Sequence, residues 1–143
     1  MSIEPYLFFN GRAEEAIEFY QEVLGAEREM LLRFNQAPEP GPEGMLPPGF
    51  ENKVMHASIL IQGARVMMSD GLSADAPAFK GFSLALEAKD GEQARRWFDA
   101  LADGGEVTMP FGKTFFAEHF GGVTDKFGVG WMVIVPNPDY AGP

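Results

Sequence analysis

The sequence predicts an α+β fold in which two βαβββ modules stand in tandem, their strands forming a curved sheet around a cleft and their helices outside. Two stretches, residues 13–24 and 94–101, place apolar side chains at helical spacing. Each follows a short apolar strand and precedes a glycine, another strand and a hairpin, so the pattern repeats. A length of 143 residues suits one domain. We expect a single domain over 1–143 with halves 1–75 and 76–140.

The first half begins with an apolar strand over Ile3–Phe9. Asn10-Gly11 is expected to end this strand and cap the helix that follows. The apolar stripe of that helix stops at Gly25, which favours a helix end there. A second strand is predicted over Ala26–Asn35.

A proline-rich loop separates this strand from the next hairpin. Gln36–Asn52 contains five prolines and is too rich in helix and strand breakers to form either. A connection of this length inside a small domain is either a lid over a pocket or a tolerated insertion, and the sequence supports both.

Val54–Asp70 is predicted to be a hairpin that turns at Gly63-Ala64, pairing Leu60 with Met67 and Ser58 with Ser69. Its two faces differ in chemistry. One face is entirely apolar and should pack on a helix, and it holds Ile59, Ile61, Val66 and Met68. The other face is mixed and should line the cleft, and it holds His56, Ser58, Leu60, Met67 and Ser69.

The second half repeats this order. A strand over Gly81–Glu87 places the small Ser83 on its cleft side, and Asp90 is expected to cap the second helix. Gly104-Gly105 ends that helix before a strand over Glu106–Met109.

The chain closes with a hairpin over Thr114–Val135. Asp125 can form an Asx-turn, and Gly128 can adopt positive φ, so the chain can reverse between Val123 and Trp131. Glu118 lies between Phe116 and Phe120 on one strand face, where burial would raise its pKa, whereas His119 should alternate to the other face.

Four motifs in order resemble the PhnB-like branch of the vicinal-oxygen-chelate superfamily, which includes glyoxalase I, bleomycin-resistance proteins and extradiol dioxygenases. They are PYLFF, AIEFYQEVLGAE, HASILI-x-G-x-x-x-MMSD and the closing run FFAEHFGGVTDKFGVGW. The resemblance spans nearly the whole chain and implies the tandem βαβββ fold. It also implies a cleft that, in metal-dependent members, takes one ligand from the first and the last strand of each half.

Fixed spacings locate those four positions here. Counting back eleven residues from the helix alanines gives Pro5 and Ser83, and counting four on from the hairpin glycines gives Met67 and Met132. None is His, Glu or Gln, and proline and methionine are poor ligands for hard or borderline divalent ions. We therefore expect no metal at this site and no cofactor.

The remaining polar candidates are His56 and Glu118, which could bind a ligand's polar group or act as an acid or base. His56 could equally be a structural histidine satisfied by a neighbouring Ser or Glu. The expected ligand-binding set is His56, Ser58, Met67, Ser69, Ser83, Phe116, Glu118 and Met132.

Composition excludes several other classes of function. A formal net charge of −10 argues against nucleic acid and anionic lipid as partners. There is no cysteine, no signal peptide pattern, no P-loop and no G-x-S-x-G. Some PhnB-like sequences bear a demethylubiquinone methyltransferase label, but a glycine-rich loop for a methyl donor is missing, so we do not expect methyl transfer.

The predicted function is a metal-independent small-molecule binding protein of the bleomycin-resistance type, with a cationic or aromatic ligand. The alternative is a glyoxalase-like or dioxygenase-like enzyme that acts on a small oxygenated substrate through an off-pattern site. We also expect a cytoplasmic homodimer, because modules of this superfamily commonly pair across a twofold axis.

Overall fold

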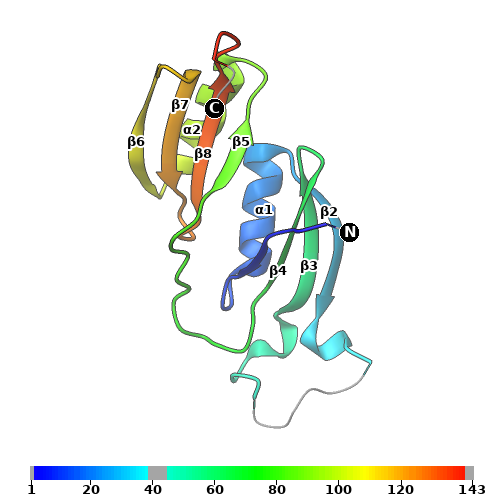
Figure 1. Cartoon of the computed structure of the whole chain (residues 1–143). Coiled ribbons are helices and arrows are strands. Elements are labelled where there is room, and N and C mark those ends of the chain that lie inside the picture. Colours follow the sequence, from blue (N-terminus) through cyan, green and yellow to red (C-terminus); the bar gives the residue numbers. More distant parts are fainter. Residues whose placement is uncertain (1, 39–44, 141–143) are drawn as a thin grey trace. The chain divides into compact units, whose positions relative to one another are not determined.

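A computed structural model describes residues 2–38 and 45–140. The chain divides into two compact units, Met1–Pro77 and Ala78–Pro143. Each unit has the element order βαβββ and one four-stranded sheet, and its helix covers one face of that sheet (Figure 1). The predicted α+β fold with two βαβββ modules in tandem is confirmed.

The first unit contains β1 Tyr6–Phe8, α1 Ala13–Leu24, β2 Glu27–Arg33, β3 Val54–Ile61 and β4 Ala64–Ser69. Its strand order is β1-β4-β3-β2, and only β1, which runs parallel to β4, departs from antiparallel pairing. The first strand is shorter than predicted: the Pro5 carbonyl oxygen still accepts from the Met67 N–H at 3.0 Å, but Ile3 is fully exposed.

The core of the first unit lies between α1 and the sheet. Ala16, Ile17 and Tyr20 of the helix are buried, as are Ile59 of β3 and Met68 of β4. Burying one large apolar side chain stabilises a fold by about 2 kcal/mol. The predicted helix-facing side of this hairpin is therefore correct, as is the helix end at Gly25, which adopts the left-handed conformation.

The predicted register of the β3–β4 hairpin is wrong by two residues. Leu60 pairs with Arg65, and Ser58 pairs with Met67 rather than Ser69. The cause is the turn, in which Gln62 (φ 51°) and Gly63 (φ 82°) both adopt positive φ, as a two-residue type I′ turn requires. A shift of two residues preserves the faces, so the side chains still alternate as predicted.

The start of α1 is held by a residue distant in sequence. The predicted Asn10-Gly11 cap is wrong: the N-cap residue is Arg12, whose side chain makes no capping bond, and the Asn10 amide donates to the Asp75 carbonyl oxygen. Instead the carboxylate of Asp70, just after β4, accepts hydrogen bonds from the Gly11, Ala13 and Val54 N–H groups, each at 2.8 Å. Asp70 is only 1% exposed.

The ends of the proline-rich loop are tied together. The Asn35 amide donates to Asn52 Oδ1 at 2.7 Å, and the Phe34 N–H donates to the Lys53 carbonyl oxygen at 3.1 Å. Two short 3-10 turns, η1 Phe34–Gln36 and η2 Phe50–Asn52, flank it, and the buried Phe50 ring packs near Gly11. Residues 39–44 of this loop lie outside the described residues, so the choice between lid and insertion stays a prediction.

The second unit contains β5 Leu84–Glu87, α2 Gly91–Ala102, β6 Glu106–Gly112, β7 Ala117–Thr124 and β8 Gly130–Pro136. Its strand order is β5-β8-β7-β6, with β5 parallel to β8. Compared with the prediction, β5 begins later and β6 continues three residues further, through Pro110. Proline is compatible with β6 because this is an edge strand.

Both predicted polar turns of the second unit are confirmed. The Asp90 carboxylate accepts from the Gln93 N–H at 2.8 Å and caps α2. Asp125 Oδ1 accepts from the Phe127 and Val129 N–H groups, and its Oδ2 accepts from the Trp131 indole N–H at 2.8 Å. This buried carboxylate closes the last hairpin.

Candidate functional site

Each sheet has one face covered by its helix and one face turned away from it, which we call the open face. In the first unit the register fixes which residues share the open face. Met67 pairs with Tyr6 of β1 on one side and with Ser58 of β3 on the other, and Ser58 pairs with Met30 of β2. His56 and Ser69 lie on this face as well, since each is two residues from a member of that row.

A hydrogen bond on this face joins Tyr6 to His56. The Tyr6 hydroxyl lies 2.8 Å from His56 Nδ1, and the ring centroids are 5.5 Å apart. Burial raises the pKa of Tyr6, and a hydrogen bond with Ser69 opposes that rise only in part, so the phenol is neutral at pH 7. One nitrogen of His56 is therefore engaged by Tyr6, and Nε2 is the atom left to meet a ligand.

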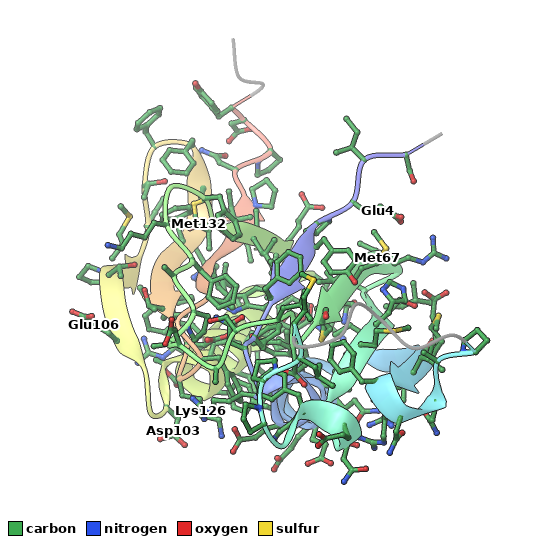
Figure 2. The ribbon with its side chains drawn as sticks, turned by 90° about the horizontal axis from the view of Figure 1, so that it is seen from below. Glu4, Met67, Asp103, Glu106, Lys126 and Met132 are labelled. Carbon is green, nitrogen blue, oxygen red and sulfur yellow. The ribbon has the colours of Figure 1, made fainter. Side chains whose placement is uncertain are left out.

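A charged cluster lies beside this pair. Ser58 Oγ donates to Glu29 Oε1 at 3.0 Å, and Glu29 also pairs with Arg65, whose guanidinium reaches Glu4 at 3.2 Å. The hydrogen bond from Arg65 lowers the pKa of Glu29, and Glu29 raises the pKa of Arg65. Figure 2 shows Glu4 on the segment before β1 and Met67 on β4. With two carboxylates and one guanidinium, the cluster carries a charge of about −1 at pH 7.

The predicted site residues did not include Tyr6, Met30, Glu4, Glu29 or Arg65. Tyr6 was missed because the spacing rule selects Pro5, whereas the residue that pairs with Met67 is Tyr6. The available signal was alternation: Tyr6 and Phe8 flank the buried Leu7, which places both on the open face.

The open face of the second unit is more apolar. A Cβ atom on Gly121 would lie 2.6 Å from the Phe98 ring of α2, so Gly121 faces the helix, and the neighbouring Phe120 and Gly122 face away from it. Met132 of β8, labelled in Figure 2, pairs with Gly122 and shares this face. The Phe116 ring adjoins the Phe120 ring at a centroid distance of 5.2 Å.

The predicted burial of Glu118 is wrong. Its side chain is exposed, because a register shift between Ala117 and His119 interrupts the alternation of β7 at this residue. His119 does face the helix side as predicted, where its ring stacks on Phe111 at a centroid distance of 5.6 Å. Ser83 precedes β5 and lies against Gly130.

The residues present do not fit the divalent metal that this fold implies. The positions on the last strands are Met67 and Met132, and their first-strand partners are Tyr6 and Ala85. Within residues 2–38 and 45–140, no three His, Asp or Glu side chains lie close enough together to hold an ion. Thioethers bind hard and borderline divalent cations weakly.

A surface hollow of about 770 Å³ lies on the helix side of the first unit and contains none of the predicted site residues. Its walls are charged, and the charges are largely paired. Arg33 makes two hydrogen bonds to Glu14, at 3.0 and 2.6 Å, and Arg12 pairs with Glu15 at 2.7 Å. The Arg33–Glu14 pair joins β2 to α1, and the Arg12–Glu15 pair joins the N-cap residue of α1 to the first turn of the same helix. Both pairs therefore have a structural role.

Comparison with known proteins adds the family. The family model described as 3-demethylubiquinone-9 3-methyltransferase matches residues 1–134. The chain belongs to this family. It is 39% identical over 142 residues to Protein YjdN of Escherichia coli (strain K12), covering 94% of this chain and 95% of that protein.

Two solved structures support the same assignment to the PhnB-like family. Protein PA1353 from Pseudomonas aeruginosa has 40% identity and a TM-score of 0.82, covering 95% of this chain and 98% of that one. A putative 3-demethylubiquinone-9 3-methyltransferase, PhnB protein, from Bacillus cereus has 30% identity and a TM-score of 0.77, covering 94% and 99%.

This PhnB-like chain also has the fold of the wider vicinal-oxygen-chelate superfamily. A glyoxylase/bleomycin resistance protein/dioxygenase domain from Frankia sp. EAN1pec matches with a TM-score of 0.61 at 11% identity, covering 94% of each chain. At that identity the likeness shows the fold alone. Of the described helices, none combines the length and the apolar character needed to cross a membrane.

Proposed function

We propose that this PhnB-like chain is a metal-independent small-molecule binding protein that takes a cationic or aromatic ligand. The observation that carries the proposal is the hydrogen bond between the Tyr6 hydroxyl and His56 Nδ1 on a partly exposed sheet face. A polar pair of this kind fixes the orientation of a ligand, while the apolar surface around it supplies most of the affinity.

The surroundings of the pair suit a small aromatic molecule. The Tyr6 and Phe8 rings are 5.2 Å apart and both partly exposed, so they offer an aromatic surface next to His56 Nε2. Ser58, Met67 and Ser69 complete the predicted contacts in this unit. In the second unit the predicted contacts are Ser83, Phe116, Glu118 and Met132, of which Glu118 is exposed and free to meet a cation.

The test is a thermal-shift screen of chelator-treated protein against metabolites and cationic aromatic antibiotics. A ligand present at a hundred times its Kd stabilises the native state by about 2.7 kcal/mol, which is readily detected. The shift should persist in EDTA and be lost in His56→Ala. Glu22→Gln, which changes an exposed residue of α1 outside the candidate site, is the control. A screen in which no compound stabilises the protein contradicts the proposal.

Calorimetry tests the metal-independent part separately. Titration of the apo protein with Zn²⁺, Ni²⁺, Mn²⁺ or Fe²⁺ should give no stoichiometric binding, and glyoxalase I activity should be absent. One equivalent bound with a Kd below about 1 μM, or roughly −8 kcal/mol, and lost in His56→Ala would contradict it.

The same hydrogen bond favours one alternative function, a glyoxalase-like or dioxygenase-like enzyme in which His56 transfers a proton. If the Nδ1–H of His56 donates to Tyr6, then Nε2 carries the lone pair of a general base. For any substrate that emerges from the screen, Tyr6→Phe would then change the pH dependence of turnover. Under the binding proposal the same variant changes affinity alone.

We further propose that the chain works as a cytoplasmic homodimer. β2 and β6 each lie at the edge of their sheet, and β6 also exposes the apolar Val107, so a second copy could pair along either of these edges. Light scattering should give twice the chain mass, whereas a monomer at every concentration would contradict the dimer.

A further inference from the structure

The two open faces share a feature that the predicted site does not include. In the first unit one row of paired residues runs across all four strands: Tyr6, Met67, Ser58 and Met30. In the second unit the corresponding row is Ala85, Met132, Gly122 and Met109. We call these the first and second methionine rows.

In both rows two methionines flank the smallest residue of the row. Ser58 separates Met67 from Met30, and Gly122 separates Met132 from Met109. Four of the eight methionines of the chain stand in these two rows, and three of the four are well exposed: Met30 43%, Met109 49% and Met132 36%. Exposed methionines on the open faces of two modules with the same plan indicate a surface for binding rather than for core packing.

The geometry of a row suits a flat ligand. Neighbouring strands lie about 4.8 Å apart, so the backbones that carry the two methionines are separated by about 10 Å. A planar ring can lie over the small central residue with a thioether at either edge. Sulfur meets aromatic rings favourably at the ring edge, and the unbranched side chain adapts to the shape between them.

The charges around the rows favour a positive ligand. Glu29 accepts a hydrogen bond from Ser58 at the centre of the first row, and Arg65 on the same face is already paired with Glu29 and Glu4. In the second sheet Glu87 pairs with Ile134, one position along the open face from Met132. The formal net charge of the chain is −10, so a cation is attracted to either face.

We propose that each methionine row is a binding surface for the planar aromatic part of a cationic ligand. This inference rests on the proposed function and specifies its ligand class and the side chains that contact the ring. It predicts that the same kind of ligand contacts all four side chains, although they come from different strands: Met30, Met67, Met109 and Met132.

The experiment uses the full chain labelled with ¹³C at the methionine methyl groups, with each signal assigned by a single Met→Leu variant. The probe is proflavine, a planar cation. Ring currents should shift the methyl signals of Met30, Met67, Met109 and Met132 and leave that of Met68 in place. Met68 is adjacent in sequence to Met67 but fully buried on the helix side, so it is a matched control.

Two further probes separate shape from charge. Cyclohexylammonium, a cation without an aromatic ring, and naphthalene-2-sulfonate, a planar anion, should each shift these signals far less than proflavine. Met67→Gln should weaken proflavine binding at the first row about fivefold, and Met132→Gln should do the same at the second row, since a sulfur–aromatic contact contributes roughly 1 kcal/mol. Glu22→Gln, at an exposed residue of α1 that belongs to neither row, should leave the affinity unchanged.

The inference is overturned if proflavine does not bind, if it shifts only methionines outside the two rows, or if either control probe shifts the four signals equally. The proposed function fails on a different result, because the thermal-shift screen can find a His56-dependent ligand whatever proflavine does. A ligand found there without any response at the four methionines would leave the binding function intact and remove this inference.

Discussion

The first N–H groups of the two helices find their hydrogen-bond acceptors in different places, one nearby in the sequence and one far away. Each helix leaves its first N–H groups without a partner inside the helix. At α2 the solution is local, because Asp90 accepts from Gln93 N–H and the Gln93 side chain accepts in turn from Lys89 N–H at 3.0 Å. At α1 the acceptor is Asp70, which is 57 residues away from its bonding partner Ala13 in the chain.

This difference shows what each cap can do besides capping. Asp90 satisfies one turn of one helix. Asp70 also accepts from Val54 N–H, so one buried carboxylate joins the start of α1, the start of β3 and the end of β4. We therefore expect Asp70 to stabilise the fold of the first unit as a whole, and Asp90 to stabilise only the end of its helix.

The largest predicted effect is that of Asp70→Ala. It leaves three N–H groups without their acceptor, and each unsatisfied buried donor costs about 1–3 kcal/mol, so we expect a loss of about 4 kcal/mol. Urea unfolding monitored by circular dichroism measures this. Asp75→Ala, at a nearby exposed carboxylate, should cost less than about 0.5 kcal/mol. Equal losses in the two variants would refute a special role for Asp70.

A smaller effect is expected at Gly91, the first residue of α2. A Cβ atom here would clash with the His119 ring, which is stacked on the Phe111 ring. Gly91→Ala should therefore cost about 2 kcal/mol by overpacking. In a His119→Ala background the same change should cost nothing, because the obstacle is gone. A double-mutant cycle that gives no coupling energy would show that the His119 ring is not the cause of the loss in stability.

Removal of the local cap should cost less again. Asp90→Ala deletes a single side-chain cap, which typically costs about 1 kcal/mol. Asp90→Ser should recover most of that loss, because a serine hydroxyl can also accept from Gln93 N–H. If Asp90→Ala proved as damaging as Asp70→Ala, the contrast between a local and a long-range cap would be wrong.

The same contrast separates what the sequence predicted from what it did not. The Asp90 cap, the Gly25 helix end and the Asp125 turn were predicted because their donors and acceptors lie within a few residues of each other. The two faces of β3 and β4 were predicted because alternation is also a local property. Each of these depends on sequence neighbours alone.

Most of the wrong predictions depend on contacts or backbone angles that the local sequence pattern does not encode. Nothing near Asp70 in the sequence indicates that it caps a helix. The register of the first hairpin was wrong because no sequence pattern indicates that Gln62 adopts a positive φ. Glu118 was predicted to be buried because a bulge in β7 is invisible to alternation. Tyr6 is different, because alternation around the buried Leu7 already places it on the open face and the spacing rule selected Pro5 instead.

The smallest effect is expected where charge, rather than a cap, acts on the start of α1. The hydrogen bond from Arg33 holds the pKa of Glu14 below its usual value of 4.5. A carboxyl whose pKa is lowered by folding adds stability above its unfolded pKa, and this stability is lost as the pH falls through the folded pKa.

Since both partners of this ion pair are partly exposed, we expect it to contribute only about 0.5 kcal/mol at pH 7. Glu14→Gln should lower stability by this amount at pH 7, and the difference from wild type should vanish as the pH falls through the lowered pKa of Glu14 in the folded state. Urea unfolding at a series of pH values measures the difference, and Arg33→Met should give a similar profile. A difference that stays constant down to pH 3 would mean that Glu14 acts by packing and not by charge.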